Sequence, residues 1–501
     1  MLLKKFSPFT WLFLAAVFLQ NGFGQEIDPS ALSLKSTISV EAGRVEDGFY
    51  KNASRGGPIQ RQWLSTTKVN LQIERALSLH LKVQAGLEGK MWFSAYPSEF
   101  QISPKQYNMP TSFFDFYLDK AQLLYEYGTA DRFFLDASIG YFPFKYNPDI
   151  RNLGEYLFRS GTYPAFLVNE FDYARARLLG FRLGNRLYNI IKQDLLVSFE
   201  TSMQPFFDGS ISYIASADFA NALEIGGGVS WSRLIQADKK LTATKNGQTL
   251  YFAAPDSTDT SYYTLSGTKL MGRASFDPKR LFGWTEGKGI LKEDDGRIYA
   301  EAAILGLENY PANPFNPSGY DALAYKMPMM IGMNIPAYPL ISYGSLALIE
   351  GLALMPGFTK DKLGIPSHPV LAMGVFPAMA LGSWAMQRFL NIDASSDLFS
   401  AEVEWYGCRY PNSYYNVAAY HLAIPATLRQ GMVPPNTYTD YDNWKWSLYL
   451  KKNITPQVCL YGQASRDHMR LPVKFSEDMD REEAMSSVDS WSWMLKMSVS
   501  F

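Results

Sequence analysis

The sequence ends on residues 489–501, Asp-Ser-Trp-Ser-Trp-Met-Leu-Lys-Met-Ser-Val-Ser-Phe, and this stretch decides the fold. Apolar side chains occupy every second position from Trp491 to Phe501, whereas the positions between them carry Ser or Lys, with Met494 as the one exception. Because successive side chains of a β-strand point to opposite faces, the pattern predicts a strand with one apolar and one polar face. Soluble sheets contain such strands too, but they rarely end the whole protein on one, with an aromatic as the last residue.

The same stretch resembles the C-terminal assembly signal of bacterial outer-membrane β-barrels. The residues that carry the resemblance are Trp493, Leu495, Met497, Val499 and Phe501. The resemblance implies recognition by the barrel-assembly machinery, with the apolar face of the strand turned to outer-membrane lipids and the polar face to a wet interior.

The amino terminus predicts export. Lys4 and Lys5 precede an apolar run at residues 11–19, and Gly22 and Gly24 supply small residues for cleavage. We therefore expect residues 1–24 to be a signal peptide that is cleaved near Gly24, and residues 25–501 to form the mature outer-membrane protein. An uncleaved anchor is the alternative, but the apolar run is too short to span a bilayer.

Composition excludes some classes of protein. The formal net charge of -1 argues against a nucleic-acid partner, because nucleic-acid-binding domains are usually strongly basic. The mean hydropathy of -0.14 is too low for a helical membrane protein. It fits a barrel, in which a polar face dilutes the apolar one.

Recurrent apolar–polar alternation predicts an all-β fold, a transmembrane antiparallel up-and-down β-barrel of about sixteen strands. Short turns, such as those at residues 75–76 and 185–186, alternate with long loops rich in Gly, Pro, Asn or Asp, as expected for periplasmic turns and outer loops. The strands are expected near residues 31–44, 61–75, 77–94, 115–129, 132–144, 173–184, 187–203, 208–220, 223–237, 261–277, 296–309, 324–336, 396–410, 441–452, 455–470 and 489–501.

One segment, residues 337–394, breaks this pattern. Residues 340–355 and 370–390 are almost wholly apolar and lack period-two alternation, which predicts a helical insertion with a kink at Pro377. The main expectation is an apolar helical hairpin packed on or in the barrel, at its periplasmic end, where it could cap or plug the lumen. A membrane-spanning helix pair is disfavoured by Glu350 and Pro377, and two missed strands are the remaining alternative.

The polar faces of the strands indicate the residues of the interior. The side chains expected to face the lumen are His80, Lys82, Asp136, Glu402 and Glu404, and Glu301 faces inward on another strand. The four histidines are scattered, and no metal-ligand spacing, Gly-x-Ser-x-Gly or phosphate loop is present. We therefore expect no enzyme, no metal and no cofactor.

The long segment at residues 140–172 is expected to form the filter. Its strand end Gly-Tyr-Phe-Pro-Phe-Lys, with the later Glu155, Arg159 and Ser160, is similar to phosphate-selective porins, in which Phe142 and Lys145 have broad counterparts. The resemblance implies that this third outer loop folds inward and narrows a pore. The residues then expected at the constriction are Lys145, Asp149, Arg151, Glu155, Arg159, Arg175 and Arg177. Because this set mixes both signs of charge, it does not establish anion or phosphate selectivity.

The expected function is a porin-like channel for passive diffusion of small hydrophilic solutes or ions. The alternative is a closed barrel that serves as a scaffold for surface adhesion or for a periplasmic partner, with a lumen filled by side chains such as Tyr125 and Tyr449. Porins are often homo-oligomers, but nothing in the sequence identifies an oligomer face.

Overall fold

The computed structural model describes residues 32–47, 49–51, 56–58, 62–92, 113–129, 131–158, 167–168, 175–199, 209–232, 234, 267–283, 291–305, 307, 327–355, 365, 368–391, 395–406, 444–466 and 491–501. The predicted signal peptide, residues 1–24, lies outside these ranges.

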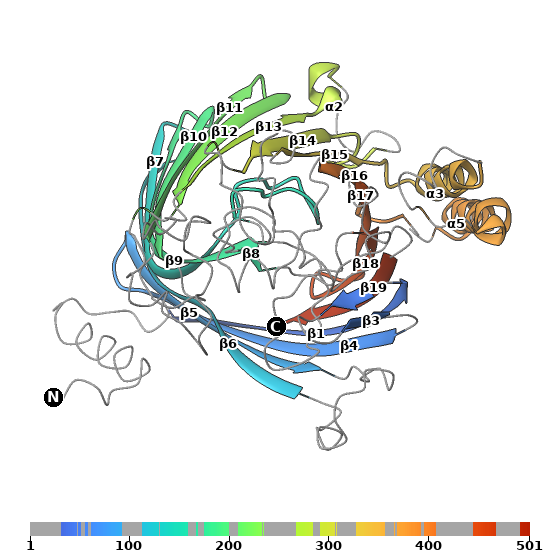
Figure 1. Cartoon of the computed structure of the whole chain (residues 1–501), viewed down its shortest axis with the longest axis horizontal. Coiled ribbons are helices and arrows are strands. Elements are labelled where there is room, and N and C mark those ends of the chain that lie inside the picture. Colours follow the sequence, from blue (N-terminus) through green and yellow to red (C-terminus); the bar gives the residue numbers. More distant parts are fainter. Residues whose placement is uncertain are drawn as a thin grey trace, which may run out of the picture.

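Sixteen strands pair antiparallel in sequence order and close into one barrel (Figure 1). Closure is made by β1, which pairs with β4 on one side and with β19 on the other, from Thr37–Ser500 to Asp47–Trp491. This confirms the predicted sixteen-stranded barrel. Its strands are β1 (Leu32–Asp47), β4 (Gln62–Ala76), β5 (Leu81–Trp92), β6 (Phe113–Thr129), β7 (Phe133–Phe144), β9 (Arg175–Leu187), β10 (Ile191–Phe199), β11 (Gly209–Phe219), β12 (Leu223–Ser232), β13 (Gly267–Phe276), β14 (Ile298–Ile304), β15 (Pro328–Asn334), β16 (Leu398–Tyr406), β17 (Trp444–Asn453), β18 (Val458–Arg466) and β19 (Trp491–Ser500).

Three further strands are short. The two-residue β8 (Leu167–Val168) pairs with the start of β9, whereas β2 (Phe49–Lys51) and β3 (Gly56–Pro58) form a separate hairpin. A one-turn helix, α2 (Pro278–Leu281), opens the connection between β13 and β14, and the Asp277 carboxylate caps it by accepting from the Lys279 N–H at 3.1 Å.

The period-two pattern sorts side chains between the two faces of the wall. Leu495 and Met497 of β19 are exposed on the outer face, as is Phe501 at the chain end. On the inner face, Glu41 of β1 is fully buried and lies 2.7 Å from the Lys68 ammonium of β4. Apolar groups outside and paired charges inside are the arrangement expected of a barrel that stands in lipid.

Several strand ends differ from the sequence-based expectation, and two of them show the reason. β5 begins at Leu81 rather than at residue 77, because Leu77–His80 form the turn, and the Leu77 and Ser78 N–H groups both donate to the Leu81 carbonyl. β9 continues to Leu187, where it pairs with both Phe133 and Ile191, so the turn falls at residues 188–190. Alternation locates a strand, but hydrogen bonding to both neighbours decides where it ends.

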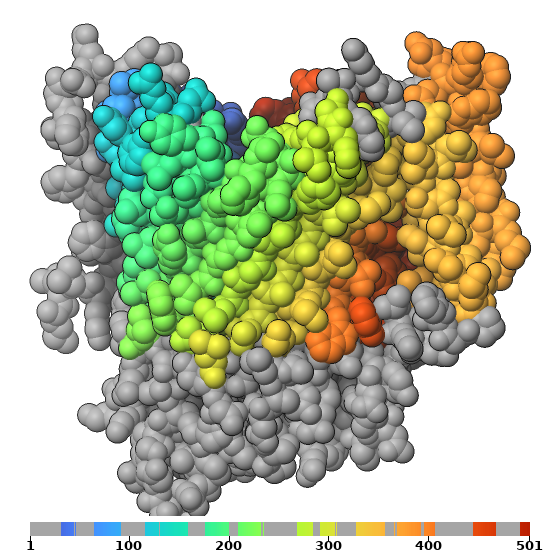
Figure 2. Space-filling view, turned by 90° about the horizontal axis from the view of Figure 1, so that it is seen from above, coloured from blue at the N-terminus to red at the C-terminus, as the bar shows by residue number. Residues whose placement is uncertain are grey.

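The insertion between β15 and β16 is helical, as predicted. It contains α3 (Pro339–Ala353), the short π-helical η6 (Leu371–Val375) and α5 (Phe376–Leu390). The π-helical turn directly precedes Pro377, which lacks the N–H that a regular helix needs. Both helices lie outside the ring of strands, so their described residues do not plug the lumen (Figures 1 and 2). Within the described ranges, no helix combines the length and hydropathy expected of a membrane span.

Candidate functional site

The chain enters the barrel directly after β7. Residues 145–158, here called the lumen loop, cross the interior of the ring before β8 (Figure 1). Gly154 and Glu155 reverse the direction of the loop with φ of +95° and +58°, in the left-handed region. At Gly154 a Cβ atom would lie 3.2 Å from two carbons of Ile150, so glycine suits both the conformation and the space.

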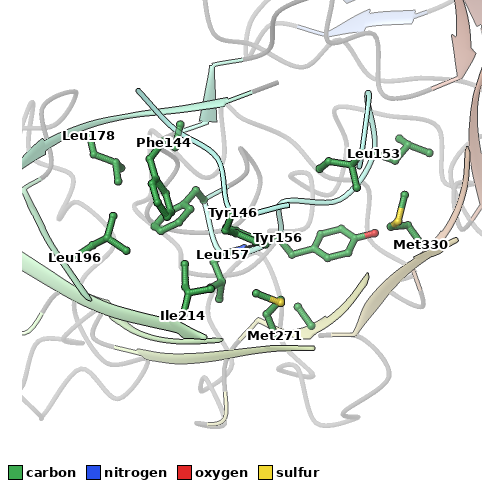
Figure 3. Close-up of a cluster of buried hydrophobic side chains, with 14 of the residues drawn as sticks. Phe144, Tyr146, Leu153, Tyr156, Leu157, Leu178, Leu196, Ile214, Met271 and Met330 are labelled. Carbon is green, nitrogen blue, oxygen red and sulfur yellow. Dashed lines mark hydrogen bonds between the residues drawn. The ribbon is translucent and has the colours of Figure 1, made fainter. Parts of the chain in front are cut away.

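The lumen loop packs on an apolar platform of the inner wall. Ile150, Leu153 and Leu157 are fully buried. They belong to a cluster with inward-facing wall residues, and Figure 3 shows Leu157 of the loop facing Ile214 and Met271 of the wall. The wall residues are Leu178, Leu196, Ile214, Met271 and Met330. Burying a side chain of this size stabilises by about 1.5–3 kcal/mol, so the platform holds the loop against the wall.

A single carboxylate holds the turn of the loop. Glu402 of β16 accepts hydrogen bonds from the backbone N–H groups of Arg151 at 2.5 Å, Asn152 at 2.9 Å and Leu153 at 2.8 Å. The Tyr299 hydroxyl of β14 donates to the same carboxylate at 3.0 Å. Three successive N–H groups directed at one anion form a backbone anion nest, here occupied by a side chain of the wall.

Two more wall carboxylates hold the flanks of the loop. Glu301 of β14 accepts from the Tyr146 hydroxyl at 2.6 Å, from the Asn147 amide at 2.7 Å and from the Tyr156 N–H at 2.9 Å. Glu404 of β16 accepts from the Tyr156 hydroxyl at 2.8 Å and lies 3.0 Å from the Lys445 ammonium. The lumen loop is therefore fixed to one side of the barrel, over β14 and β16.

Asp149 of the loop pairs with Arg297, just before β14, at 2.9 Å. Burial alone would raise the pKa of Asp149, but the Arg297 guanidinium and a hydrogen bond from Ser275 outweigh it and hold the pKa below its usual value. Asp149 is thus charged at neutral pH and adds an ion pair to the fixation of the loop.

Glu155 behaves in the opposite way. Burial and the neighbouring Glu301 carboxylate raise the pKa of this loop residue to about 8. One oxygen accepts from the Asn147 N–H at 2.6 Å, whereas the other is buried and accepts no hydrogen bond. A protonated carboxyl fits this environment, because its O–H removes the charge that burial penalises.

A cavity of about 480 Å³ lies beside the lumen loop, and strands between β7 and β13 contribute its wall. Five cationic side chains line it, together with three carboxylates: Lys145, Arg182, Arg186, Lys192 and Arg273, and Asp136, Asp194 and Glu224.

Most of these charges are paired across the cavity wall. Arg182 pairs with Asp136 and, at 2.7 Å, with Asp194, whereas Arg273 lies 2.5 Å from Glu224. Arg186 is exposed, and among the described residues no carboxylate lies within ion-pair distance of it. The lining therefore has more positive than negative charge, and Arg186 presents part of that excess to solvent.

The residues predicted for the constriction do not form one ring. Glu155 and Asp149 are buried in the contacts of the loop, and Arg177 is buried between Asp119, at 3.0 Å, and Glu88, at 3.7 Å. These three do not face open space, which corrects the expectation that they line a passage. Asp149 and Glu155 are buried because the loop folds onto the wall and covers its own charges, whereas Arg177 of β9 is buried where it pairs with two carboxylates of neighbouring strands.

The remaining predicted cations are placed differently. Lys145 lines the cavity and donates to the Ile150 carbonyl at 2.9 Å. Arg151 is partly exposed, and its guanidinium donates to the Pro148 carbonyl at 3.2 Å. Arg159 lies outside the described residues, as does the side chain of Arg175.

Four of the five predicted lumen residues lie inside the barrel. Glu402 and Glu404 lie beneath the loop, Asp136 lines the cavity, and Lys82 lies 2.6 Å from the inward-facing Glu126. The exception is His80, which lies in the turn before β5 and not on a strand face. This corrects the expectation that His80 faces the lumen.

The His80 ring contacts two outward-facing tyrosines of β6, with centroids 6.0 Å from Tyr125 and 5.4 Å from Tyr127. Tyr125 is therefore not an interior residue. The neighbouring Glu126 faces inward, and strand alternation turns its two neighbours outward.

Sequence reasoning missed the platform. A signal for it exists, because single apolar residues interrupt the polar inward rows of several strands, such as Ile214 between Ser212 and Ser216 on β11. It also missed Tyr299 and Arg297, although alternation puts both on the face of Glu301, and it missed Tyr156, for which no periodic pattern offers a clue.

No family model and no curated protein matches this chain. Among solved structures it is similar to OprB of Pseudomonas putida at high pH (9% identity, 94% of each chain covered, TM-score 0.45). It is also similar to OmpF of Salmonella typhi in complex with daunomycin (8% identity, 95% of this chain and 100% of that chain covered, TM-score 0.40). A triple mutant of the Rhodopseudomonas blastica porin matches at 7% identity over 94% of this chain and 100% of that chain, with a TM-score of 0.35. On its own geometry, a closed sixteen-stranded barrel with a loop folded into the lumen, the chain is a porin-like β-barrel.

Proposed function

We propose that the chain is an outer-membrane channel through which small hydrophilic solutes diffuse passively. The observation that carries the proposal is the lumen loop, which three carboxylates fix to the side of β14 and β16 while a charged cavity stays beside it. Solutes are selected by the width of the passage and by the charge of the side chains that line it, and no bond is made or broken.

The charge of the cavity supports a weak preference for anions. Five cations against three carboxylates lower the barrier for an anion, and the exposed Arg186 is the cation best placed to meet one. The paired charges nearby moderate the field, so the preference is small. Phosphate specificity is not part of the proposal.

The route to the membrane is proposed from the two chain ends. The signal peptide, cleaved near Gly24, directs export, and the residues Trp493 to Phe501 of the last strand present the assembly signal to the barrel-assembly machinery. The outward apolar side chains of β19 then contact outer-membrane lipid.

A swelling assay on proteoliposomes tests the proposal. The mature chain is reconstituted and challenged with neutral sugars of increasing size, and we expect uptake of the smallest sugars with a sharp upper limit. The Glu402→Ala variant, which releases the loop, should admit larger sugars, whereas Glu126→Gln, an inward-facing carboxylate away from the loop, should keep the original limit. A folded barrel that admits no sugar in any of the three forms would instead support the scaffold alternative.

A further inference from the structure

The helical hairpin is the element that channel function leaves unexplained. It consists of α3 and of η6 with α5, and it stands outside the ring of strands (Figures 1 and 2). It begins next to the turn end of the barrel, where the Ile335 N–H donates to the Phe399 carbonyl at 2.8 Å. It also reaches the loop end, where the His368 ring lies 6.4 Å from the ring of Trp491, the first residue of β19. The hairpin therefore covers the full height of the wall.

The longer helical segment of the hairpin has the length of the apolar layer of a bilayer, whereas α3, with 15 residues, is shorter, and no described helix combines that length with the hydropathy of a lone membrane span. Twenty helical residues, from Leu371 to Leu390, have a length of about 30 Å, which is close to the thickness of the hydrocarbon core. Each helical segment carries a single charged residue, and both are close to an end: Glu350 in the last turn of α3 and Arg388 in that of α5. The middle of the hairpin is free of charge.

The two helices pack on each other, and their buried positions carry mostly small residues, while large apolar side chains stay exposed. The buried positions include Ser342, Ala353, Ala372, Ala380 and Ser383, which allow close approach of the backbones. The exposed positions include Leu340, Leu348, Val370, Met373, Leu381, Phe389 and Leu390. Large exposed apolar patches on a protein mark surfaces that contact a partner, a ligand or a membrane.

Large apolar residues of the hairpin are exposed to a similar or greater degree than those on the outer face of the barrel wall. Leu381 is 60% exposed, compared with 58% for Leu495 of β19 and 57% for Ile331 of β15. The hairpin thus presents large apolar side chains outside the ring of strands, as the outer face of the wall does. We propose that the hairpin is embedded in the membrane beside the barrel, with α3 and α5 in direct contact with lipid acyl chains.

The backbone of the hairpin is compatible with this position, because helical N–H and C=O groups are satisfied within each helix. Neither helix has to cross the bilayer as an isolated span, because the two helices pack on each other. The inference rests on the proposed membrane location but not on conduction, so a closed barrel would carry the same hairpin.

Spin labels on the full-length chain test the inference. Cys408 and Cys459 are first replaced by serine. A single label is then placed through Leu381→Cys or, in a second variant, through Met373→Cys, so that the test still stands if one of the two variants fails to fold. The chain is reconstituted in phosphatidylethanolamine–phosphatidylglycerol vesicles. Collisions with oxygen, which partitions into lipid, are compared with collisions with a water-soluble nickel chelate. Leu495→Cys is the lipid-facing control and Asn189→Cys, in an exposed turn, is the water-facing control.

We expect both hairpin labels to give the oxygen-to-nickel ratio of the label at 495. A ratio equal to that at 189 would overturn the inference. Spin–spin broadening that disappears on dilution with unlabelled chain would also overturn it, because a second copy would then cover the hairpin. If the label at 495 itself gave the oxygen-to-nickel ratio of the label at 189, the barrel would not be in the membrane. The proposed membrane location would then be wrong, and so would the proposed position of the hairpin.

Discussion

Removal of the Glu402 side chain should release the lumen loop without unfolding the barrel. In the Glu402→Ala variant, the N–H groups of Arg151, Asn152 and Leu153 lose their acceptor while the platform still covers them. A hydrogen bond to a charged group contributes about 1.5–3 kcal/mol, so three of them at the lower end total about 4–5 kcal/mol. Because about 1.4 kcal/mol corresponds to a factor of ten, local opening should become roughly a thousandfold more frequent.

Hydrogen–deuterium exchange of the refolded protein in detergent measures this opening. We expect the amides at 151–153 to lose about three orders of magnitude of protection, while the amides of β10 and β11 keep theirs, since their ladder bonds do not involve the loop. Glu126→Gln is the matched control and should leave the loop protected. Unchanged protection of residues 151–153 in Glu402→Ala would refute the reasoning, because the nest would then contribute nothing to the fixation of the loop.

Three further predictions concern the loop and the cavity. The pKa of Glu155 is about 8, above the usual 4.5, so the stability that its neutral form gives the loop is complete below about pH 4.5 and is lost as the pH rises to about 8. The protection of the Asn147 amide, corrected for intrinsic exchange, should fall over this range in the native chain and stay flat in Glu155→Gln; a fall in both would contradict the assignment. Leu157→Ala should destabilise the docked loop by about 2–5 kcal/mol, which should appear as faster proteolysis within the loop. Leu179→Ala, on the exposed outer face of β9, should leave the proteolysis rate of the loop unchanged. Equal proteolysis rates in the two variants would argue against the platform. Arg186→Glu should shift the reversal potential of the channel towards cation preference. Arg132 is an exposed turn residue that does not line the cavity, so Arg132→Glu should shift the reversal potential little. Equal shifts in the two variants would mean that the cavity is not on the ion path.

The barrel could be predicted from the sequence because its rule is local. Alternation such as that of residues 491–501 assigns each side chain to a face, and the count of strands follows from repeating that assignment. The ends of strands could not be located in this way. Leu187 belongs to β9 because Phe133 as well as Ile191 pairs with it, and Phe133 lies far from it in the sequence.

The interior site could be predicted only in part. The inward direction of Glu402 and Glu404 followed from their positions on one strand, and Glu301 was assigned in the same way. Their role did not follow, because it depends on a loop that starts some 250 residues earlier in the chain and buries them. Nor can sequence alone tell a charge that lines a passage from one that folding covers, such as Asp149.

The most direct test of the central claim is the single-channel conductance of the refolded mature chain in a planar bilayer. We predict steady conductance steps and, in a salt gradient, a reversal potential that indicates a small preference for anions over cations. Glu402→Ala should give larger or noisier steps, because the loop no longer stays against β16. A chain that is folded by hydrogen exchange and conducts in neither form would contradict the account, and the barrel would then be a scaffold and not a channel.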